Sequence, residues 1–141
     1  MRRAALGLVL ALLASGAFGK DAPPKFRWPL IGKLEKAKDG HGIDIVAPEG
    51  EAVHAASDGE VIYASDEIAS FGQMIVIRHA DDYVTTYAHL QELAVSKGVK
   101  VRRGQIIGKS GKTGDVTKPE LHFELRKGDA SLDPVGYLSP R

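Results

Sequence analysis

The sequence predicts an all-β domain, a two-layer antiparallel sandwich of the barrel-sandwich kind. Most apolar runs beyond residue 40 are short, rich in Val and Ile, and bounded by Gly, Asp or Pro, which is typical of strands. The stretches 50–61 and 98–106 also share a pattern, Gly-x-x-Val followed by a glycine and a second Val or Ile. Glycine permits the positive φ of hairpins and bulges, so the repeat indicates successive hairpins of one antiparallel system.

Each apolar run between two such boundaries is expected to be one strand. The only stretch that favours a helical turn is 90–95. Tyr87 and Phe123 are expected in the core, and Phe26 with Trp28 is expected to close one edge of a sheet. The expected strands cover 42–47, 52–56, 59–65, 73–79, 83–89, 99–101, 106–109 and 121–127.

Residues 1–19 have the layout of a secretory signal peptide. Arg2 and Arg3 precede an uncharged apolar run and a small-residue end at Gly19. That run is shorter than the ~20 residues that cross a bilayer, which favours removal over the alternative of a retained anchor. Residues 20–25 are expected to be a short tether and 26–141 the domain. The chain is therefore expected to be exported, to the periplasm or cell envelope, with no membrane span after removal of the leader.

Charge and cysteine content narrow the function classes. The chain has 19 basic and 18 acidic residues, and the leader takes two of the arginines with it. The mature surface is therefore close to neutral, whereas nucleic acids and anionic membranes require a clustered basic face. No nucleic-acid partner is expected. Because there is no cysteine, the exported domain must be stabilised by its core alone or by a metal.

The run Glu120-Leu121-His122 is the most informative local pattern. Residues i and i+2 of a strand point to the same face. A His-x-His version of this run would aim two imidazoles at one metal centre. This chain aims one imidazole and one carboxylate, so the chemistry of the site depends on Glu120 and His122.

Three separated motifs carry a family resemblance: His41-Gly42-Ile43-Asp44, Tyr87-Ala88-His89 and Leu121-His122-Phe123-Glu124. Their order and spacing resemble the LytM or lysostaphin-type peptidase family over residues 26–138. The resemblance implies a two-layer antiparallel β fold with a groove floored by a sheet. It also implies, for active members, a zinc site and peptide cross-bridges of peptidoglycan as substrate.

The resemblance assigns zinc to three ligands in active members: a histidine four residues before the motif aspartate, that aspartate, and the second histidine of His-x-His. Asp44 and His122 match two of them, and His89 matches a histidine beside the metal-bound water. Gly40 stands at the first ligand position. His41 lies three residues before Asp44, an offset that turns it to the opposite face of a regular strand. A bulge between the flanking glycines is the alternative, and would return His41 to the site.

Glu120 stands where active members have the first histidine of His-x-His. A carboxylate there could act as a third ligand or as a general base. It would not stabilise a developing oxyanion as an imidazolium does. We therefore expect a domain without ordinary activity and without a cofactor. Zinc is expected only if the domain is competent, with Asp44, His122 and His41 as metal ligands and His89 and Glu120 as catalytic groups.

Three functions follow. The first is a non-catalytic LytM domain similar to murein hydrolase activators, which activates N-acetylmuramoyl-L-alanine amidases in septal cell-wall splitting. The second is a zinc metalloendopeptidase that cleaves peptidoglycan cross-link peptides, with His41 or Glu120 completing the zinc site. The third is a module that binds glycan or stem peptide in the groove. All three place the chain in the cell envelope, with peptidoglycan or a cell-wall amidase as partner.

The remaining features have plainer interpretations. His54 is expected at the surface and His79 is expected to make local hydrogen bonds. The stretch 111–118 is expected to be a mobile polar loop beside the site. A biotinyl or lipoyl carrier domain would also show glycine-punctuated hairpins, but no hairpin tip here has the lysine setting that a carrier needs.

Overall fold

The structure, a computed structural model, describes residues 25–141. The expected signal peptide 1–19 and nearly all of the expected tether 20–25 lie outside these residues. No helix of the described part has the length and apolar character needed to cross a membrane. The elements are β1 (Lys33–Lys36), β2 (Ile43–Val46), β3 (Ala52–His54), β4 (Gly59–Ser65), β5 (Gln73–Arg78), η3 (Ala80–Asp82), β6 (Tyr83–Leu90), β7 (Glu92–Leu93), β8 (Lys100–Val101), β9 (Ile106–Lys109), β10 (Glu120–Lys127), β11 (Ala130–Leu132) and η4 (Pro134–Tyr137).

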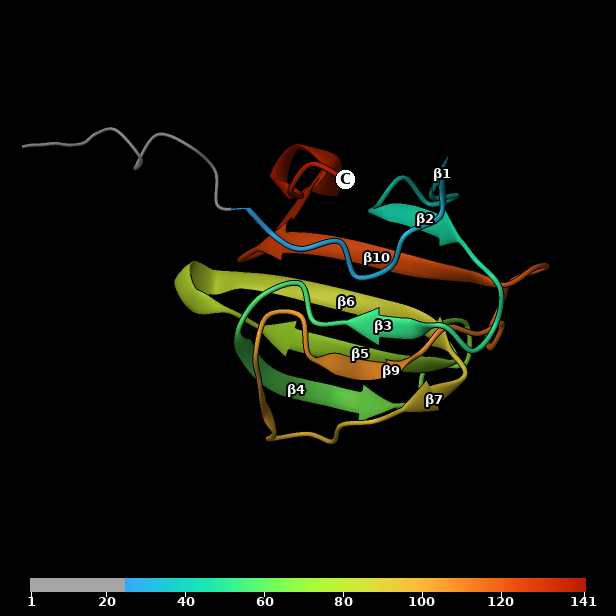
Figure 1. The fold of residues 1–141 in the computed structure, drawn as a ribbon, viewed down its shortest axis with the longest axis horizontal. Coiled ribbons are helices and arrows are strands. Elements are labelled where there is room, and N and C mark those ends of the chain that lie inside the picture. The colour runs from blue at the N-terminus through green and yellow to red at the C-terminus, as the bar shows by residue number, and fades with distance from the viewer. Residues whose placement is uncertain (1–24) are drawn as a thin grey trace, which may run out of the picture.

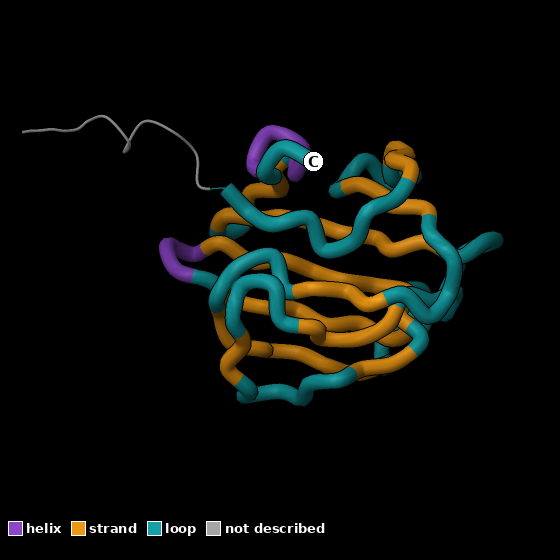
Figure 2. Tube along the Cα trace, viewed as in Figure 1, coloured by secondary structure: helices purple, strands orange, loops and turns teal. Residues whose placement is uncertain are grey.

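Two antiparallel sheets form the described domain. The larger has eight strands in the order β1-β2-β10-β6-β5-β4-β8, with β11 paired to β10, and the smaller has the order β3-β9-β7. Figure 1 shows the smaller sheet in front of β5 and β4, while β1 and β2 lie to one side of it. The all-β, two-layer prediction is confirmed. Figure 2 shows how little of the chain is helical, with the two short 3-10 helices at η3 and η4.

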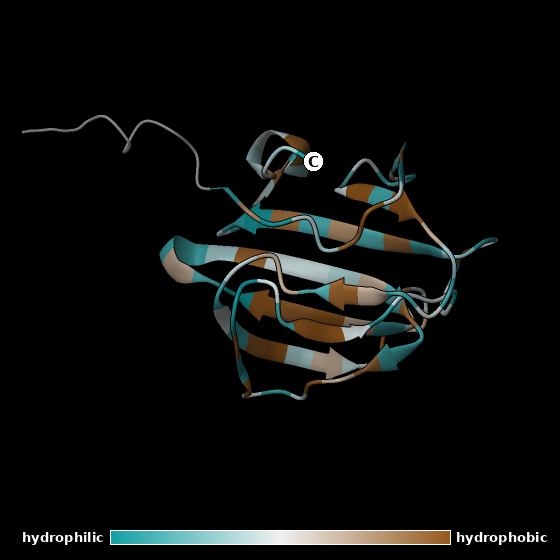
Figure 3. Ribbon diagram, viewed as in Figure 1, coloured by the Kyte–Doolittle hydropathy of each residue, from teal (hydrophilic) through white to brown (hydrophobic). Residues whose placement is uncertain are grey.

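The core fills the space between the two sheets. The facing strands are rich in apolar residues, as the hydrophobic colouring of parts of β3, β4, β5 and β9 in Figure 3 shows. Tyr87 and Phe123 are both fully buried, with ring centroids 5.4 Å apart, so their predicted place in the core is confirmed. Phe26 is buried and forms a bridge to Leu138. Trp28 is half-buried, and its indole Nε1 donates to the carbonyl of Ser139, 2.6 Å away.

Each of the eight expected strands is present, with ends that shift by up to two residues. The helical turn expected over 90–95 is wrong. Gln91 and Ala94 instead donate backbone hydrogen bonds to Lys109 and Ile107, which places β7 in the smaller sheet. Strands β1 and β11 were not expected. Each is short and pairs with a longer strand, so tertiary pairing rather than local pattern determines it.

The register of three neighbouring strands positions the polar face of the larger sheet. On β10, His122 lies opposite Asp44 of β2 on one side and opposite Ala88 of β6 on the other. Residues directly opposite each other point to the same face. The alternate residues of β10, Leu121 and Phe123, point into the core and are fully buried.

Candidate functional site

The candidate site lies on the outer face of the larger sheet, where β2, β10 and β6 run side by side. A cavity of about 220 Å³ opens there, lined by Asp44, His89, Glu120 and His122 together with residues of three loops. All four side chains are buried, at 6%, 7%, 8% and 5% exposure. The structure therefore brings four of the five predicted site residues together.

Both ring nitrogens of His122 face a carboxylate. Nδ1 lies 2.7 Å from Oδ1 of Asp44, and Nε2 lies 2.7 Å from Oε2 of Glu124. An ionised carboxylate only accepts, so both nitrogens donate and the ring is an imidazolium. Burial lowers the pKa of His122, but the two hydrogen bonds outweigh burial and raise that pKa to about 9. Phe71 stacks on the ring at 6.1 Å between centroids.

Glu120 extends the same row of side chains. It lies two residues before His122 on β10 and therefore shares its face. Burial, and then the neighbouring charge of Asp44, raise the pKa of the Glu120 carboxyl above its ordinary value. Lys118 lies near enough to oppose this shift, and its ammonium pairs with Glu35 at 2.8 Å. The site is thus rich in carboxylates held close together.

His89 reaches the site through an unusual backbone conformation. Its neighbour Ala88 lies opposite His122, so in a regular strand His89 would point to the other face. Its φ is 67°, a left-handed value that is uncommon outside glycine, and the pairing of β5 with β6 is irregular at this end. Irregular pairing of this kind redirects a side chain. The ring centroid of His89 accordingly lies 6.2 Å from that of His122.

The hydrogen bonds of His89 fix its tautomer. Nδ1 lies 2.8 Å from the carbonyl oxygen of Thr113, which can only accept, so Nδ1 carries the proton. Burial lowers the pKa of His89, and the nearby charge of His122 lowers it further. The ring is therefore neutral near pH 7, and its Nε2 keeps a free lone pair.

Two loops wall the site and hold each other in place. The backbone N–H of His89 donates to Phe71, and that of Asp115 donates to Ser70. Thr113 is anchored twice by its hydroxyl, which donates to the carbonyl of Leu90 and accepts from the backbone of Gln73. The stretch 111–118 lies beside the site as expected, but at Thr113 it is fixed by these bonds rather than being a freely mobile loop.

His41 lies apart from the other predicted site residues. Its side chain is exposed and lines a different cavity, together with Gly40 and Gly42. His41 lies in the turn before β2 begins at Ile43, so neither the regular strand nor the bulge considered for it describes its position. Gly42 has a φ of 77°, and a side chain there would press on the carbonyl of Phe123. Gly42 thus lets the turn pack closely against β10 immediately before β2 begins at Ile43.

Two acidic residues of the site were not predicted. Glu124 bonds to His122 as described above, and Asp39 offers a carboxylate within 4.8 Å of the donor atoms of His122 and Glu124. The signal for Glu124 was present in the sequence, because the same i, i+2 rule that joins Glu120 to His122 joins His122 to Glu124. Asp39 lies in a turn, where its carboxylate also accepts from the backbone of His41 at 2.9 Å, and no periodicity indicates its direction.

The donors do not fit the zinc site that the resemblance implies. Gly40 has no side chain, and His41 lines another cavity. His122 donates from both nitrogens, so neither has a lone pair for a metal in this arrangement. Apart from Nε2 of His89, the other nearby donors are carboxylates, which suit hard oxygen-preferring cations better than catalytic zinc. The group Asp39, His122 and Glu124 is close enough together to hold an ion if His122 loses a proton.

The other two histidines have structural environments. His54 is half-buried, and its Nδ1 lies 2.9 Å from the carbonyl oxygen of Gly104, so it is less exposed than expected. His79 is buried, with Nδ1 2.6 Å from the carbonyl oxygen of Asp58 and Nε2 2.7 Å from the hydroxyl of Thr85. The hydrogen bonds expected for His79 are thus present, but the one to Asp58 reaches another strand region rather than a local turn.

Comparison with known proteins places this geometry in a family. Residues 38–134, more than half of the chain, match the model described as Peptidase family M23. The chain is 39% identical over 119 residues to the uncharacterized lipoprotein YgeR of Escherichia coli, covering 81% of this chain and 47% of that protein. It is also 39% identical over 121 residues to the murein hydrolase activator NlpD of Escherichia coli, covering 82% of this chain and 32% of that protein. The chain thus spans less than half the length of either relative.

A solved structure supports the same assignment. The crystal structure of a putative peptidase M23 from Pseudomonas aeruginosa superposes with a TM-score of 0.76 at 28% identity, covering 83% of this chain and 54% of that one. The family model spans the positions of Asp44, His89 and His122. The chain belongs to peptidase family M23.

Proposed function

We propose that this chain is a non-catalytic M23 domain of the cell envelope, which acts in peptidoglycan remodelling by activating N-acetylmuramoyl-L-alanine amidases during septal cell-wall splitting. One observation carries the proposal. His122 is held as an imidazolium between Asp44 and Glu124, at the position where the family resemblance puts a zinc ligand. The positive charge of the ring takes the place that a metal would otherwise fill between the carboxylates.

The rest of the site supports the same function. Gly40 offers no third ligand, and Glu120 replaces an imidazole with a carboxylate. His89 keeps a free Nε2, and in a domain that binds no metal this nitrogen would have no metal-bound water to act on. A folded domain with a well-ordered groove and a closed ion cluster is suited to binding rather than to hydrolysis.

The relatives support the envelope role. NlpD is named a murein hydrolase activator and YgeR is named a lipoprotein. An activator works by binding one state of its target more tightly than another, so it needs a recognition surface and no chemistry of its own. An exported location, in the periplasm or cell envelope, and a cell-wall amidase or peptidoglycan as partner follow from this proposal.

The test combines three measurements on the purified full chain. Zinc content is expected to stay below about a tenth of an equivalent, and purified peptidoglycan is expected to release no fragments. Adding the chain to an N-acetylmuramoyl-L-alanine amidase from the same organism is expected to raise the rate of peptidoglycan release. His122→Ala should keep that stimulation if the domain folds. Absence of both stimulation and a complex with the amidase would contradict the proposal.

A zinc endopeptidase is the second candidate, favoured by the closeness of donor atoms on Asp39, His122 and Glu124. In that function Asp44 and His122 would hold the metal, and Glu120, which lines the same cavity, would complete the site in place of His41. The metal would supply activation of water for hydrolysis. His89 would orient the water or the substrate carbonyl through Nε2. Stoichiometric zinc together with peptide-bond cleavage that is lost in His122→Ala would establish this candidate instead.

A further inference from the structure

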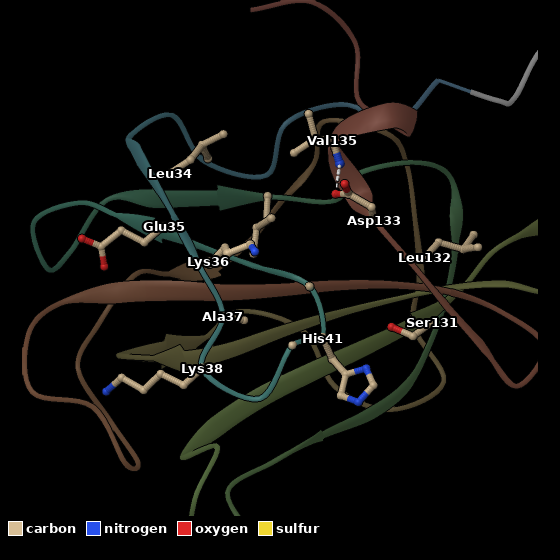
Figure 4. Close-up of a pocket in the computed structure, with 13 residues that line it drawn as sticks. Leu34, Glu35, Lys36, Ala37, Lys38, His41, Ser131, Leu132, Asp133 and Val135 are labelled. Carbon is tan, nitrogen blue, oxygen red and sulfur yellow. Dashed lines mark hydrogen bonds between the residues drawn. The ribbon is translucent and has the colours of Figure 1, made fainter.

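A second groove lies at the β1 end of the larger sheet, away from the histidine site. It has a volume of about 800 Å³ and is formed by β1, by the turn between β1 and β2, and by the segment from β11 to η4. Figure 4 shows these residues around the groove, with Val135 and Leu132 on the C-terminal side. Lys38 lines both this groove and the histidine site, so the turn that carries it separates the two.

The floor of this groove is the part of the inner sheet face that the smaller sheet does not cover. Leu34 lies opposite Ile45, so it points to the side of the sheet that elsewhere forms the core. Ile43, Leu132 and Val135 complete the apolar lining, and Val135 is 46% exposed. An apolar strip of this kind, left open at the edge of a core, is a common feature of recognition sites.

The rim of the groove carries uncompensated positive charge. Lys36 and Lys38 are exposed, and neither forms an ion pair within residues 25–141. The two acids that line the groove are already engaged. Glu35 pairs with Lys118 at 2.8 Å, and the carboxylate of Asp133 accepts from the backbone of Val135 at 3.1 Å. Only Glu35 is neutralised by an ion pair, and Asp133 keeps its negative charge, so Lys36 and Lys38 leave the groove with a net positive charge of one.

The geometry of β1 specifies the shape of the ligand. Among the described residues β1 pairs with β2 alone, so its outer backbone edge has no strand beside it. An extended segment can add to such an edge, with every second side chain directed at the same face. Leu34 and Lys36 of β1 lie two residues apart on the groove side. A segment paired to β1 would place every second side chain on the groove side, one over Leu34 and the next over Lys36.

A second copy of the chain is a poor occupant. Two β1 strands paired antiparallel across a twofold axis would gather the exposed lysines of both copies, Lys33 and Lys36, at one interface, where their like charges repel. Lysine on an edge strand protects against such self-pairing. The same lysines favour an acidic strand from a different protein.

We propose that the groove beside β1 is a docking site for an extended, acidic and apolar segment of a partner protein, which adds as a strand to β1. Its apolar side chains lie on Leu34 and Val135, and its carboxylates pair with Lys36 and Lys38. The groove shares Lys38 with the histidine site but none of Asp44, His89, Glu120 and His122, so the proposal does not depend on whether the domain is catalytic or an activator.

The experiment measures binding of two fluorescent peptides to the full chain. In one, two valines alternate with two glutamates, so that each face of the extended peptide carries valine and glutamate in turn; in the other, lysine replaces each glutamate. We expect the acidic peptide to bind at least about tenfold more tightly than the basic one. Lys36→Glu with Lys38→Glu should weaken the acidic peptide by about tenfold and strengthen the basic one. The matched control is Lys97→Glu with Lys109→Glu, which changes the same net charge at two other exposed lysines.

The apolar half of the proposal has its own pair of variants. Val135→Gln removes an apolar side chain from the groove, whereas Ile106→Gln removes one that is 53% exposed elsewhere. We expect Val135→Gln to weaken the acidic peptide about fivefold and Ile106→Gln to leave it unchanged.

Three results would overturn the docking site. One is equal affinity for the two peptides, or no binding of the acidic peptide. Another is an equal effect of the Lys36/Lys38 and Lys97/Lys109 reversals. The third is a concentration-dependent dimer, seen by analytical ultracentrifugation, that Lys36→Glu with Lys38→Glu alters, because the groove would then belong to an interface between copies.

Discussion

Asp44 and His122 face each other across β2 and β10, with Oδ1 and Nδ1 2.7 Å apart. The register of the two strands fixes this contact, because directly opposed residues share a face. The family resemblance gives the same two side chains to a zinc ion, yet here they are bonded to each other. Glu124 holds the second nitrogen of the ring, and the three groups form a closed ion cluster.

We expect the domain to lose stability at alkaline pH, because this cluster needs a protonated His122. The measurement includes a chelator so that no metal competes for the ring. The pKa of His122 rises from 6.5 to about 9 on folding. The stabilisation is therefore complete below pH 6.5 and is lost as the pH rises through 9. Between these values the free energy of unfolding of the wild type should fall by about 3 kcal/mol relative to His122→Gln. Urea unfolding of both proteins at several pH values measures this difference in the free energy of unfolding.

Glu124→Gln is the control for this prediction. It keeps the size of the side chain and a hydrogen-bonding oxygen, but removes one of the two charges that hold the imidazolium. The alkaline loss should be smaller than in the wild type and shifted to lower pH. If the pH dependence of Glu124→Gln matches that of the wild type, Glu124 does not stabilise the charged ring.

His79 should make the free energy of unfolding fall at acid pH, whereas His122 makes it fall at alkaline pH. Burial lowers its pKa below 6.5, so the folded domain favours the neutral ring. Its contribution to stability is present above pH 6.5 and is lost as the pH falls toward the folded-state pKa. The free energy of unfolding of the wild type, relative to His79→Gln, should therefore be larger at pH 7.5 than at pH 5. An equal difference at both values would contradict the prediction.

His79 belongs to a buried row of hydrogen-bonded groups that also includes Thr85 and Tyr87. Nδ1 donates to Asp58, so Nε2 accepts from Thr85, whose oxygen can accept from Tyr87, and the Tyr87 oxygen accepts from the backbone of Ala56. Thr85→Val keeps the shape but breaks two of these bonds. It should lower the free energy of unfolding by about 2 kcal/mol, which urea unfolding measures. A loss below a few tenths of a kcal/mol would show that this row of hydrogen bonds does not stabilise the domain.

The left-handed backbone of His89 predicts an inverted preference between glycine and alanine. At a φ of 67°, glycine lacks the steric clash that alanine suffers. His89→Gly should therefore be more stable than His89→Ala by about 1 kcal/mol. His54 lies in β3 and lacks a positive φ, so His54→Gly should be less stable than His54→Ala. Thermal unfolding of the four variants measures both orders, and the same order at both sites would contradict the assigned backbone.

Two glycines of the β1–β2 turn predict different responses to alanine. Gly40 and Gly42 both have positive φ, but an added Cβ at Gly40 meets nothing within 4 Å, whereas at Gly42 it presses on the carbonyl of Phe123. Gly40→Ala should cost about 1 kcal/mol of stability, and Gly42→Ala about 3 kcal/mol or more. Similar losses at both positions would mean that Gly42 does not pack against β10 as described.

The strands that carry the site were predictable because each is a short apolar run with clear boundaries. The i, i+2 rule joins Glu120 to His122 within one strand. It does not apply to His41, which lies in the turn before β2 begins at Ile43. The same rule, carried one step further, would have given Glu124. The helical turn over 90–95 failed because the pairing of β7 with β9 determines that segment.

The sequence by itself determined the fold class, the family and the identity of the side chains at Asp44, His89, Glu120 and His122, because short-range alternation and motif spacing are local properties of a chain. Only the tertiary structure decided that His122 lies between two carboxylates, that His89 turns into the site, and that Asp39 approaches it from a turn. These depend on strand register and on the close packing of loops. Strand register and loop packing are set by contacts between segments distant in the sequence, which local patterns do not specify.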